Sequence, residues 1–430
     1  MALSVADAIP SDLSYFDPQI IQTCILSEYD QEYGPIATLR AGTPIEFFIP
    51  GADGIYLDLS NSKLEIKLRV TLADGTNIAG NHHVGPANLL LHSLFSNVSV
   101  ELAGRPISDP NNLYSYRAYI ETLLSYDKQV LDTRARCEGW HMDTAGSFDA
   151  MAHDGNNMGL RHRMGWVATS ATVTLIGRPH LDLFHQEKCI PPNCSLKLRL
   201  IPQPNTFVLK TVQGEAANAY RVDIRSARMF IRMREVAPSL ILAHEQMLQK
   251  GNFYYPFTGV TMKQLTIANG VTSFQQENVY MGKLPNRLAI GMVADGTITG
   301  SYTLNPYHFQ NFGANYISIR VNGEQIPRVA LQPNFAAGDY IREYMSVLEA
   351  LGLDSENQAI SLNPTEWAGG STLFVFKLSS GSAGVRSIPK TGSVRLEIRF
   401  AAATNANINL ILFAEFSELF EIDKFKNIIQ

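Results

Sequence analysis

Five side chains in this sequence are of the types that hold a metal ion in cupin-like β-barrel enzymes: His82, His83, His180, His185 and Glu187. A zinc or iron site needs three ligands that converge on one point. Neighbouring residues on a strand point to opposite faces, and so do residues five apart, which separates His82 from His83 and His180 from His185. The pattern therefore predicts no metal ligand, no catalytic residue and no cofactor-binding residue. A cupin-like enzyme remains a minor alternative.

Motifs for covalent catalysis and nucleotide binding are absent from the chain. It has neither the Gly-x-Ser-x-Gly turn of serine hydrolases nor the Gly-x-x-x-x-Gly-Lys-Ser/Thr loop that holds phosphates. The four cysteines are Cys24, Cys137, Cys189 and Cys194, and their spacing does not fit a zinc knuckle. They are typical of reduced thiols in a protein made inside a cell, although a disulfide between Cys189 and Cys194 stays open. We expect a protein that is not an enzyme.

Three tryptophans suggest a different chemistry, because glycan-binding sites often place an exposed aromatic ring beside Asp or Asn on loops. The candidates are Trp140, Trp166 and Trp367. A glycan-binding, lectin-like β-sandwich is therefore the main alternative function. The polar residues near the first two tryptophans are Asp143, Asp149, Asp154, Asn156 and Asn157.

The composition limits the class of protein. The 430 residues are 45% hydrophobic and only 17% charged, so the chain must bury much of its surface in a core or against partners. A net charge of -5 argues against a protein whose main task is to wrap nucleic acid. No apolar run reaches the roughly 18 residues that cross a bilayer, so we expect no transmembrane segment. The N-terminus lacks the features of a secretory signal.

Short strands with a period of two dominate the chain. Turns rich in Gly, Pro and Asn separate them, which indicates an antiparallel sandwich or barrel. Helical periodicity is confined to residues 113–124 and 340–351, and Ser239 could cap a third helix that ends near Gln249. The clearest strands cover residues 64–70, 98–102, 196–200, 317–321 and 394–398.

An internal repeat is the most informative feature of the sequence. Residues 98–104, Val-Ser-Val-Glu-Leu-Ala-Gly, match residues 317–323, Ile-Ser-Ile-Arg-Val-Asn-Gly. Each copy then has an Arg-x-Tyr inside a predicted helix, at Arg117 and Arg342, whose expected role is to fix the helix against its barrel. Further matching segments begin at Ile190-Pro191 and Ile388-Pro389. Because the matches keep the same order, they predict two copies of one fold.

Both copies also end alike, with a long strand over residues 220–236 and 407–423. The first copy is longer, and the extra length is expected in the irregular stretch 134–166. We place the boundary near Pro238. The predicted units are an N-terminal arm over residues 1–40, a first jelly roll over residues 41–237 and a second over residues 238–430.

The predicted fold is all-β, with two tandem eight-stranded antiparallel jelly rolls, a double jelly roll, and short helices in loops. Two such barrels in one chain have a geometric consequence. Three chains around a threefold axis would place six similar barrels in a nearly hexagonal ring that can tile a shell. The low charge and many aromatic residues suit wide interfaces between barrels.

Two stretches resemble a known family. Residues 84–98, Val-Gly-Pro-Ala-Asn-Leu-Leu-Leu-His-Ser-Leu-Phe-Ser-Asn-Val, and residues 113–124 are similar to the double jelly-roll major capsid proteins of Polinton (Maverick) elements, adintoviruses and virophage-like viruses. The resemblance spans about residues 45 to 425. Shorter matches follow at residues 180–186, 282–287, 305–309, 341–344 and 420–423.

The resemblance implies a structural role in a virion. Proteins of this family form homotrimeric, hexon-like capsomers that pack with neighbouring capsomers into an icosahedral shell. The shell encloses double-stranded DNA without sequence-specific binding, and a single jelly-roll penton protein fills the vertices. The resemblance also implies assembly inside the host cell.

Five arginines in the predicted strand 220–236 need an interpretation. Arginines and apolar residues alternate along this strand, and the alternation shifts by one residue near Ser226. Such a shift predicts a β-bulge there. One hypothesis places some of these arginines on the inner shell surface, near the genome. The alternative is a solvated or subunit-paired face, since arginine makes good interface contacts. The residues are Arg221, Arg225, Arg228, Arg232 and Arg234.

Overall fold

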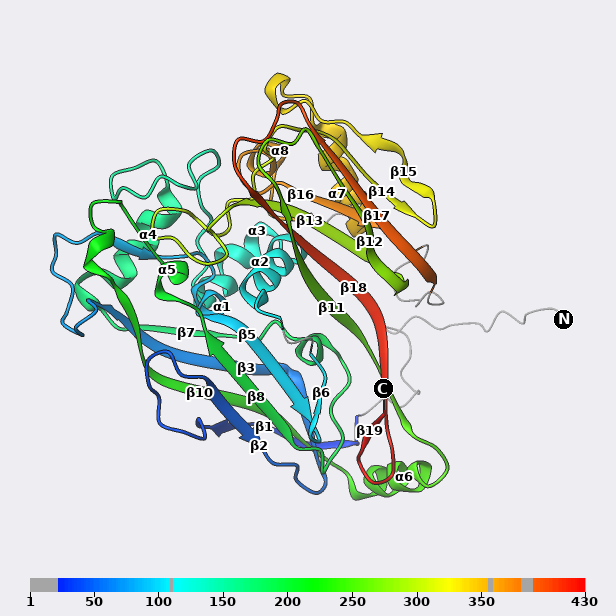
Figure 1. Ribbon diagram of the computed structural model, residues 1–430. Coiled ribbons are helices and arrows are strands. Elements are labelled where there is room, and N and C mark those ends of the chain that lie inside the picture. The colour runs from blue at the N-terminus through cyan, green and yellow to red at the C-terminus, as the bar shows by residue number, and fades with distance from the viewer. Residues whose placement is uncertain (1–21, 109–110, 355–358, 380–389, 430) are drawn as a thin grey trace, which may run out of the picture.

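The computed structural model describes residues 22–108, 111–354, 359–379 and 390–429. Its strands form two barrels, one from each half of the chain, and Figure 1 shows helices α1, α2 and α3 in the space between them. No helix in these described ranges is both long and apolar enough to cross a membrane. Ile388 and Pro389, from the predicted repeat, lie outside the described residues.

The first barrel consists of two four-stranded antiparallel sheets. Their strand orders are β1-β10-β3-β7 and β2-β8-β5-β6, and a small pair, β4-β9, lies beside them. The bounds are β1 Ile25–Tyr33, β2 Ile45–Ile49, β3 Ile55–Thr71, β4 Val84–Pro86, β5 Phe95–Leu102, β6 Arg105–Pro106, β7 Val173–Gly177, β8 Leu196–Pro202, β9 Leu209–Thr211 and β10 Arg221–Val236.

The second barrel repeats this arrangement with the orders β11-β18-β13-β16 and β12-β17-β14-β15, and β19 pairs with β18. The bounds are β11 Phe253–Ile267, β12 Ser273–Lys283, β13 Arg287–Ala294, β14 Ala314–Val321, β15 Glu324–Leu331, β16 Leu373–Lys377, β17 Thr391–Phe400, β18 Ile408–Ile422 and β19 Ile428–Ile429.

Each barrel has the strand order of a jelly roll. Among the eight main strands of each barrel, which leave out β4, β9 and β19, the first strand pairs with the last, and the second pairs with the last but one. This connectivity closes two Greek keys into one eight-stranded sandwich. The predicted fold class, all-β with two tandem jelly rolls, is therefore confirmed. All five predicted strands lie within β3, β5, β8, β14 and β17.

The sequence repeat marks the same hairpin in each barrel. The β5–β6 turn has positive φ at Ala103 and Gly104, and the β14–β15 turn has positive φ at Asn322 and Gly323. Two successive residues of this kind form the tight turn that suits the twist of a two-residue hairpin. The longer connection in the first copy is also present, because the β6–β7 crossing contains the predicted irregular stretch 134–166.

Both predicted helices with clear periodicity are present, as α2 Tyr114–Ser125 and α7 Ile341–Leu351. The third, α6 Pro238–Leu248, begins differently, since its N-cap is Ala237 and Pro238 occupies the first turn. The predicted cap at Ser239 is therefore wrong, because proline fits the start of a helix without any capping side chain. The remaining helices are α1 Leu90–Ser93, α3 Lys128–Asp132, η1 Arg134–Glu138, α4 Met158–Val167, η2 Ala168–Ser170, η3 Asp182–His185, α5 Asn205–Val208, η4 Ala216–Asn218, η5 Phe335–Ala337 and α8 Pro364–Ala368.

The predicted N-terminal arm, residues 1–40, needs a correction. Its residues 25–33 form β1, which pairs with β10 from Tyr33 back to Ile25. Several acidic side chains of β1 face arginines of β10, so charge pairing offsets its weak hydrophobic pattern. Residues 1–21 lie outside the described part of the chain. No strand pairing in the described residues crosses α6, so we keep the proposed boundary near Pro238 between barrels 41–237 and 238–430.

The core of each barrel follows directly from the alternation in its strands. In β3, Leu64, Ile66, Leu68 and Val70 are at most 1% exposed, while the charged residues between them face outward. Burial of such a side chain stabilises the fold by about 1.5–3 kcal/mol. The two cores join into one continuous apolar cluster through α2.

Candidate functional site

Helix α2 is the element that holds the two barrels together. Ten of its residues are buried, on nearly every side of the helix. A helix that is covered all round belongs in an interior, between two packed bodies. Because α2 belongs to the first barrel, the residues that cover its far side come from the second.

Tyr307, in the β13–β14 connection of the second barrel, makes the closest of these contacts. Its ring stacks on Tyr119 of α2, with centroids 4.1 Å apart and planes 1° from parallel. Its hydroxyl meets the hydroxyl of Ser93 at the end of α1. Tyr307 is fully buried, so this ring fixes the second barrel to the helices of the first.

A buried polar network makes a second contact between the barrels. Arg163 of α4 donates to Asp143 at 2.7 Å, and the other carboxylate oxygen of Asp143 accepts from Asn305 at 3.0 Å. Asn305 belongs to the second barrel and also donates its backbone N–H to Asp149 at 2.7 Å. His308 then contacts the remaining oxygen of Asp149 at 2.6 Å. The long β6–β7 connection of the first barrel therefore serves to bind the second.

A third contact is ionic. Arg117 of α2 pairs with Glu121 at 2.8 Å and with Asp182 at 2.6 Å, and Asp182 accepts the backbone N–H of Val260 in β11 at 3.1 Å. Burial opposes ionisation of Glu121, but Arg117 and His180 outweigh it and hold the pKa of Glu121 well below its usual range. Burial raises the pKa of Asp182 despite the nearby guanidinium.

The Arg-x-Tyr of the second barrel makes contacts within its own barrel, unlike that of the first, whose Tyr119 stacks on Tyr307 of the second barrel. Arg342 of α7 donates to the carbonyl oxygens of Ala330 at 3.1 Å and Val329 at 2.9 Å in β15. Tyr344 donates its hydroxyl to the carbonyl oxygen of Leu362 at 2.7 Å. These bonds attach the helix to its own barrel, in the role that the repeat predicts.

The predicted separation of His180 from His185 is wrong. His185 lies at the end of η3, not on a strand, so the two imidazole rings come within 5.2 Å of each other. Glu121 joins them, with its carboxylate 2.6 Å from Nδ1 of His180. His82 instead contacts the Tyr220 hydroxyl at 2.7 Å, and His83 stacks on His153. Glu187 is exposed.

The acid response of the fold should depend on His185. Burial lowers its pKa to about 3, whereas an unfolded imidazole titrates near 6.5. Below about pH 6.5 the unfolded state takes up a proton that the folded state does not, so stability falls as the pH falls toward 3. Urea titrations in the presence of a chelator measure the free energy of unfolding at each pH. Between pH 6.5 and 4 this free energy should fall less for His185→Gln than for the parent protein.

Above about pH 7.5 the imidazole is neutral in both the folded and unfolded states. The variant and the parent should therefore differ there by a constant free energy of unfolding. Profiles that stay parallel below pH 6.5 would contradict the prediction.

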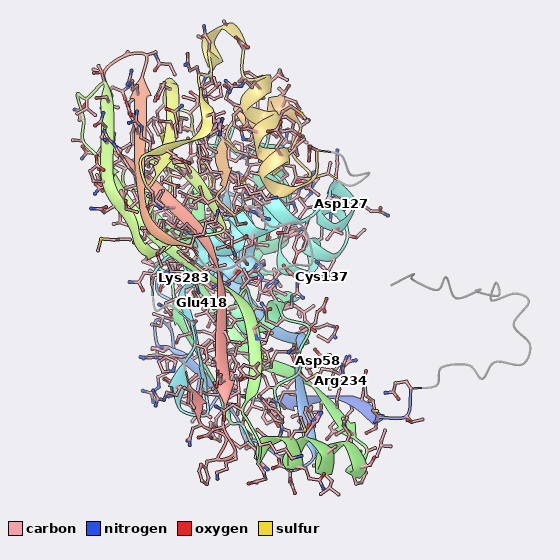
Figure 2. The ribbon with its side chains drawn as sticks, turned by 90° about the vertical axis from the view of Figure 1, so that its right-hand side faces the viewer. Asp58, Asp127, Cys137, Arg234, Lys283 and Glu418 are labelled. Atoms are coloured by element: carbon pink, nitrogen blue, oxygen red, sulfur yellow. The ribbon has the colours of Figure 1, made fainter. Side chains whose placement is uncertain are left out.

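The five arginines of β10 have partners within the chain. Arg228 pairs with Glu65 and Glu32, Arg232 with Asp30, and Arg234 with Asp58. Figure 2 shows Asp58 and Arg234 together on neighbouring strands. Arg225 pairs with Asp223, and Arg221 donates to Thr71. These contacts lie within one chain, so the placement of the arginines toward the genome or toward a neighbouring subunit stays a prediction. The predicted bulge is confirmed by the register shift between Ile224 and Ser226.

The cysteines are free thiols, which closes the question of a Cys189–Cys194 disulfide. Cys194 is buried and Cys189 is half-buried, whereas Cys24 and Cys137 are exposed.

Two of the three candidate tryptophans are buried in the core. Trp140 is 2% exposed and Trp367 is fully buried, where Trp367 donates its indole N–H to the carbonyl of Leu373. Trp166 is half-buried, and its ring lies near that of His141. Among their predicted polar partners, Asp143 forms an ion pair with Arg163, and Asn157 caps α4. The lectin-like alternative therefore has no support from these residues.

Solved structures exist that superpose on nearly the whole of this chain. A chain in the cryo-EM structure of the Sputnik virophage superposes with a TM-score of 0.63 at 12% identity, covering 99% of this chain and 93% of that one. The Faustovirus major capsid protein gives a TM-score of 0.63 at 10% identity, with coverage of 95% and 92%. A chain of the PBCV-1 virus capsid gives 0.61 at 12% identity, with coverage of 97% and 100%.

The chain is a double jelly roll. Both barrels and their relative placement enter these superpositions, because nearly the whole chain is covered. By sequence, an uncharacterized protein of Caenorhabditis elegans, F54H12.2, is 21% identical over 422 residues, which cover 94% of this chain and 97% of that protein. No family model matches the chain.

The residues that join the two jelly rolls were only partly visible in the sequence. Asn305, Tyr307 and His308 fall in the short family-like match at residues 305–309, but their contacts could not be read from it. Arg163 gave no signal, since it lies in the irregular stretch, and Asp143 was singled out only as a candidate glycan contact. His92 and Glu138, which meet His180, were also missed.

Proposed function

We propose that this protein is the major capsid protein of a double-stranded DNA virus or virus-like element. The observation that carries the proposal is the pair of equivalent jelly rolls, joined by a largely buried junction. A chain with two similar barrels is suited to a threefold assembly in which six barrels form a nearly hexagonal tile. Proteins named as major capsid proteins share this fold over nearly their full length.

The proposed partners follow from this role. Three copies of the chain form a hexon-like capsomer, neighbouring capsomers meet edge to edge, and a single jelly-roll penton protein occupies the vertices. The assembled shell encloses double-stranded DNA without reading its sequence, and assembly takes place inside the host cell before the protein resides in the virion. This role is structural and needs no catalytic residue.

The mass of the purified protein in solution tests the proposal. Native mass spectrometry should show a complex of three chains of 47.6 kDa each, and negative-stain images should show a particle with a nearly hexagonal outline. A large interface should keep this complex together at micromolar concentration. A strict monomer or a stable dimer at that concentration would overturn the proposal.

A further inference from the structure

Three buried side chains meet at one point beside the junction. His92 lies on α1, Glu138 ends η1, and His180 follows β7, so three separate segments supply them. One ligand atom from each lies within 4.8 Å of the other two. Nε2 of His92 is 3.4 Å from Oε2 of Glu138, and the ring of His180 stands perpendicular to that of His92 at 4.6 Å. The three residues are 1%, 6% and 2% exposed, respectively.

Two of the atoms that face this point have no hydrogen-bond partner among the described residues apart from the 3.4 Å ion-pair contact that they make with each other. They are Nε2 of His92 and Oε2 of Glu138, both fully shielded from solvent. A buried polar atom without a hydrogen bond costs about 1–3 kcal/mol, and a single long contact offsets only part of that cost. A bound cation would satisfy both.

The opposite side of each imidazole is already held. Nδ1 of His92 lies 2.9 Å from the Tyr114 hydroxyl, and Nδ1 of His180 lies 2.6 Å from Glu121, which Arg117 holds in turn. Metal-binding histidines characteristically use one ring nitrogen for the metal and bond the other to a carboxylate or another oxygen. This arrangement leaves Nε2 of both rings for a ligand.

The backbone is shaped to admit Glu138. A Cβ atom on Gly177 would lie 2.4 Å from Cγ of Glu138, so a side chain there would displace the carboxylate. Gly139, the residue that follows Glu138 in the chain, has a φ of +86°, and a Cβ on it would lie 2.7 Å from Cβ of Leu90. Both glycines therefore permit the close approach that brings Glu138 to His92.

Charge also suits a cation. Arg117 forms ion pairs with Glu121 and Asp182, whereas the ion pair that Glu138 makes among the described residues is with His92. Burial lowers the pKa of His92, which keeps this imidazole in the neutral form that binds metals. His180 also lines a cavity of about 290 Å³, together with Glu121 and His185.

We propose that His92, Glu138 and His180 bind a divalent transition metal ion, with zinc as the preferred occupant. Two imidazole nitrogens, one carboxylate oxygen and a water molecule would complete a tetrahedral zinc site. With bonds of about 2.0–2.2 Å, tetrahedral ligand atoms lie roughly 3.3 Å apart, close to the distance between His92 and Glu138. The ion would link α1, η1 and the segment that follows β7. This inference is independent of the proposed capsid role.

Metal content of the full-length protein tests the proposal. After treatment with a chelator and dialysis against Zn²⁺, elemental analysis should give one zinc per chain. Co²⁺ should produce the intense visible absorption of a tetrahedral site. Glu138→Gln keeps the size of the side chain, and we expect it to weaken zinc binding by more than about 100-fold, because changes behind the ligands alone cost 10–100-fold.

Two further variants locate the ion. Glu121→Gln, behind His180, should weaken binding by about 10–100-fold, and His185→Gln should leave it unchanged. Zinc should raise the Tm of the parent protein but not that of Glu138→Gln. Absence of stoichiometric zinc and cobalt in the folded parent would overturn the proposal. So would full binding by Glu138→Gln, or loss of binding in His185→Gln alone, which would move the ion to Glu121, His180 and His185.

Discussion

Replacing Arg163 by methionine should lower the free energy of unfolding by about 3–5 kcal/mol. Arg163 and Asp143 both have side chains with no exposed surface, and their oxygen and nitrogen atoms are 2.7 Å apart. Arg163 also donates to the backbone carbonyls of Pro86 and His141. Methionine fills much of the same volume but leaves a buried carboxylate and two carbonyls without their donor. Urea denaturation of the purified protein measures the loss.

A matched control lies on the same helix. Arg161 of α4 is exposed and donates to the Met158 sulfur, so Arg161→Met should stay within about 0.5 kcal/mol of the parent. The double variant Arg163→Met with Asp143→Leu removes the stranded carboxylate and should recover part of the loss. A destabilisation by Arg163→Met that is no larger than that of Arg161→Met would contradict the burial argument.

The barrels could be predicted from the sequence because each strand is marked by its own alternation of apolar and polar residues. Residues 64–70 alternate without a break, and the same alternation recurs in the strand before each hairpin turn. The repeat then supplied the topology, since two copies of one eight-stranded unit have few ways to fold. The change of phase near Ser226 was equally local, and the bulge is where the pattern placed it.

The junction could not be predicted, because its contacts join residues that are distant in the chain. The sequence of α2 shows one apolar face, but the second barrel also covers its other sides. His180 and His185 were assigned to a strand from their spacing, whereas a 3₁₀ turn brings their rings together. Trp140 and Trp367 could not be told from exposed binding residues, since aromatic rings beside Asp and Asn occur in cores as well.

The partners of His92 were also impossible to predict from the sequence. It stands inside the apolar run Leu89-Leu-Leu-His-Ser-Leu-Phe95, where a buried histidine is unexpected. That is a signal that the residue has a partner, but it does not name one. Glu138 and His180 belong to distant segments, η1 and the loop after β7, and only the folded chain brings them to His92.

Replacing Tyr307 by alanine should produce a loss of similar size, about 3–5 kcal/mol, through removal of a large buried side chain. The ring packs against Tyr119, Tyr116 and Phe207, and its hydroxyl meets Ser93. The lost volume lies between the barrels, so the surrounding residues belong to two bodies that cannot both relax into it. The change should be visible in urea denaturation and as faster hydrogen exchange of the α2 backbone amides.

Tyr307→Phe separates packing from hydrogen bonding. It keeps the stacked ring and removes only the hydroxyl, which should cost about 1 kcal/mol, since Ser93 still donates to the carbonyls of Asn88 and Leu89. Tyr254→Ala removes an exposed tyrosine and should have little effect. If Tyr307→Ala matched Tyr254→Ala, the ring would not hold the barrels together. If Tyr307→Phe matched Tyr307→Ala, the hydroxyl would be the main contact, and the stacking of Tyr307 on Tyr119 would follow from the junction without stabilising it.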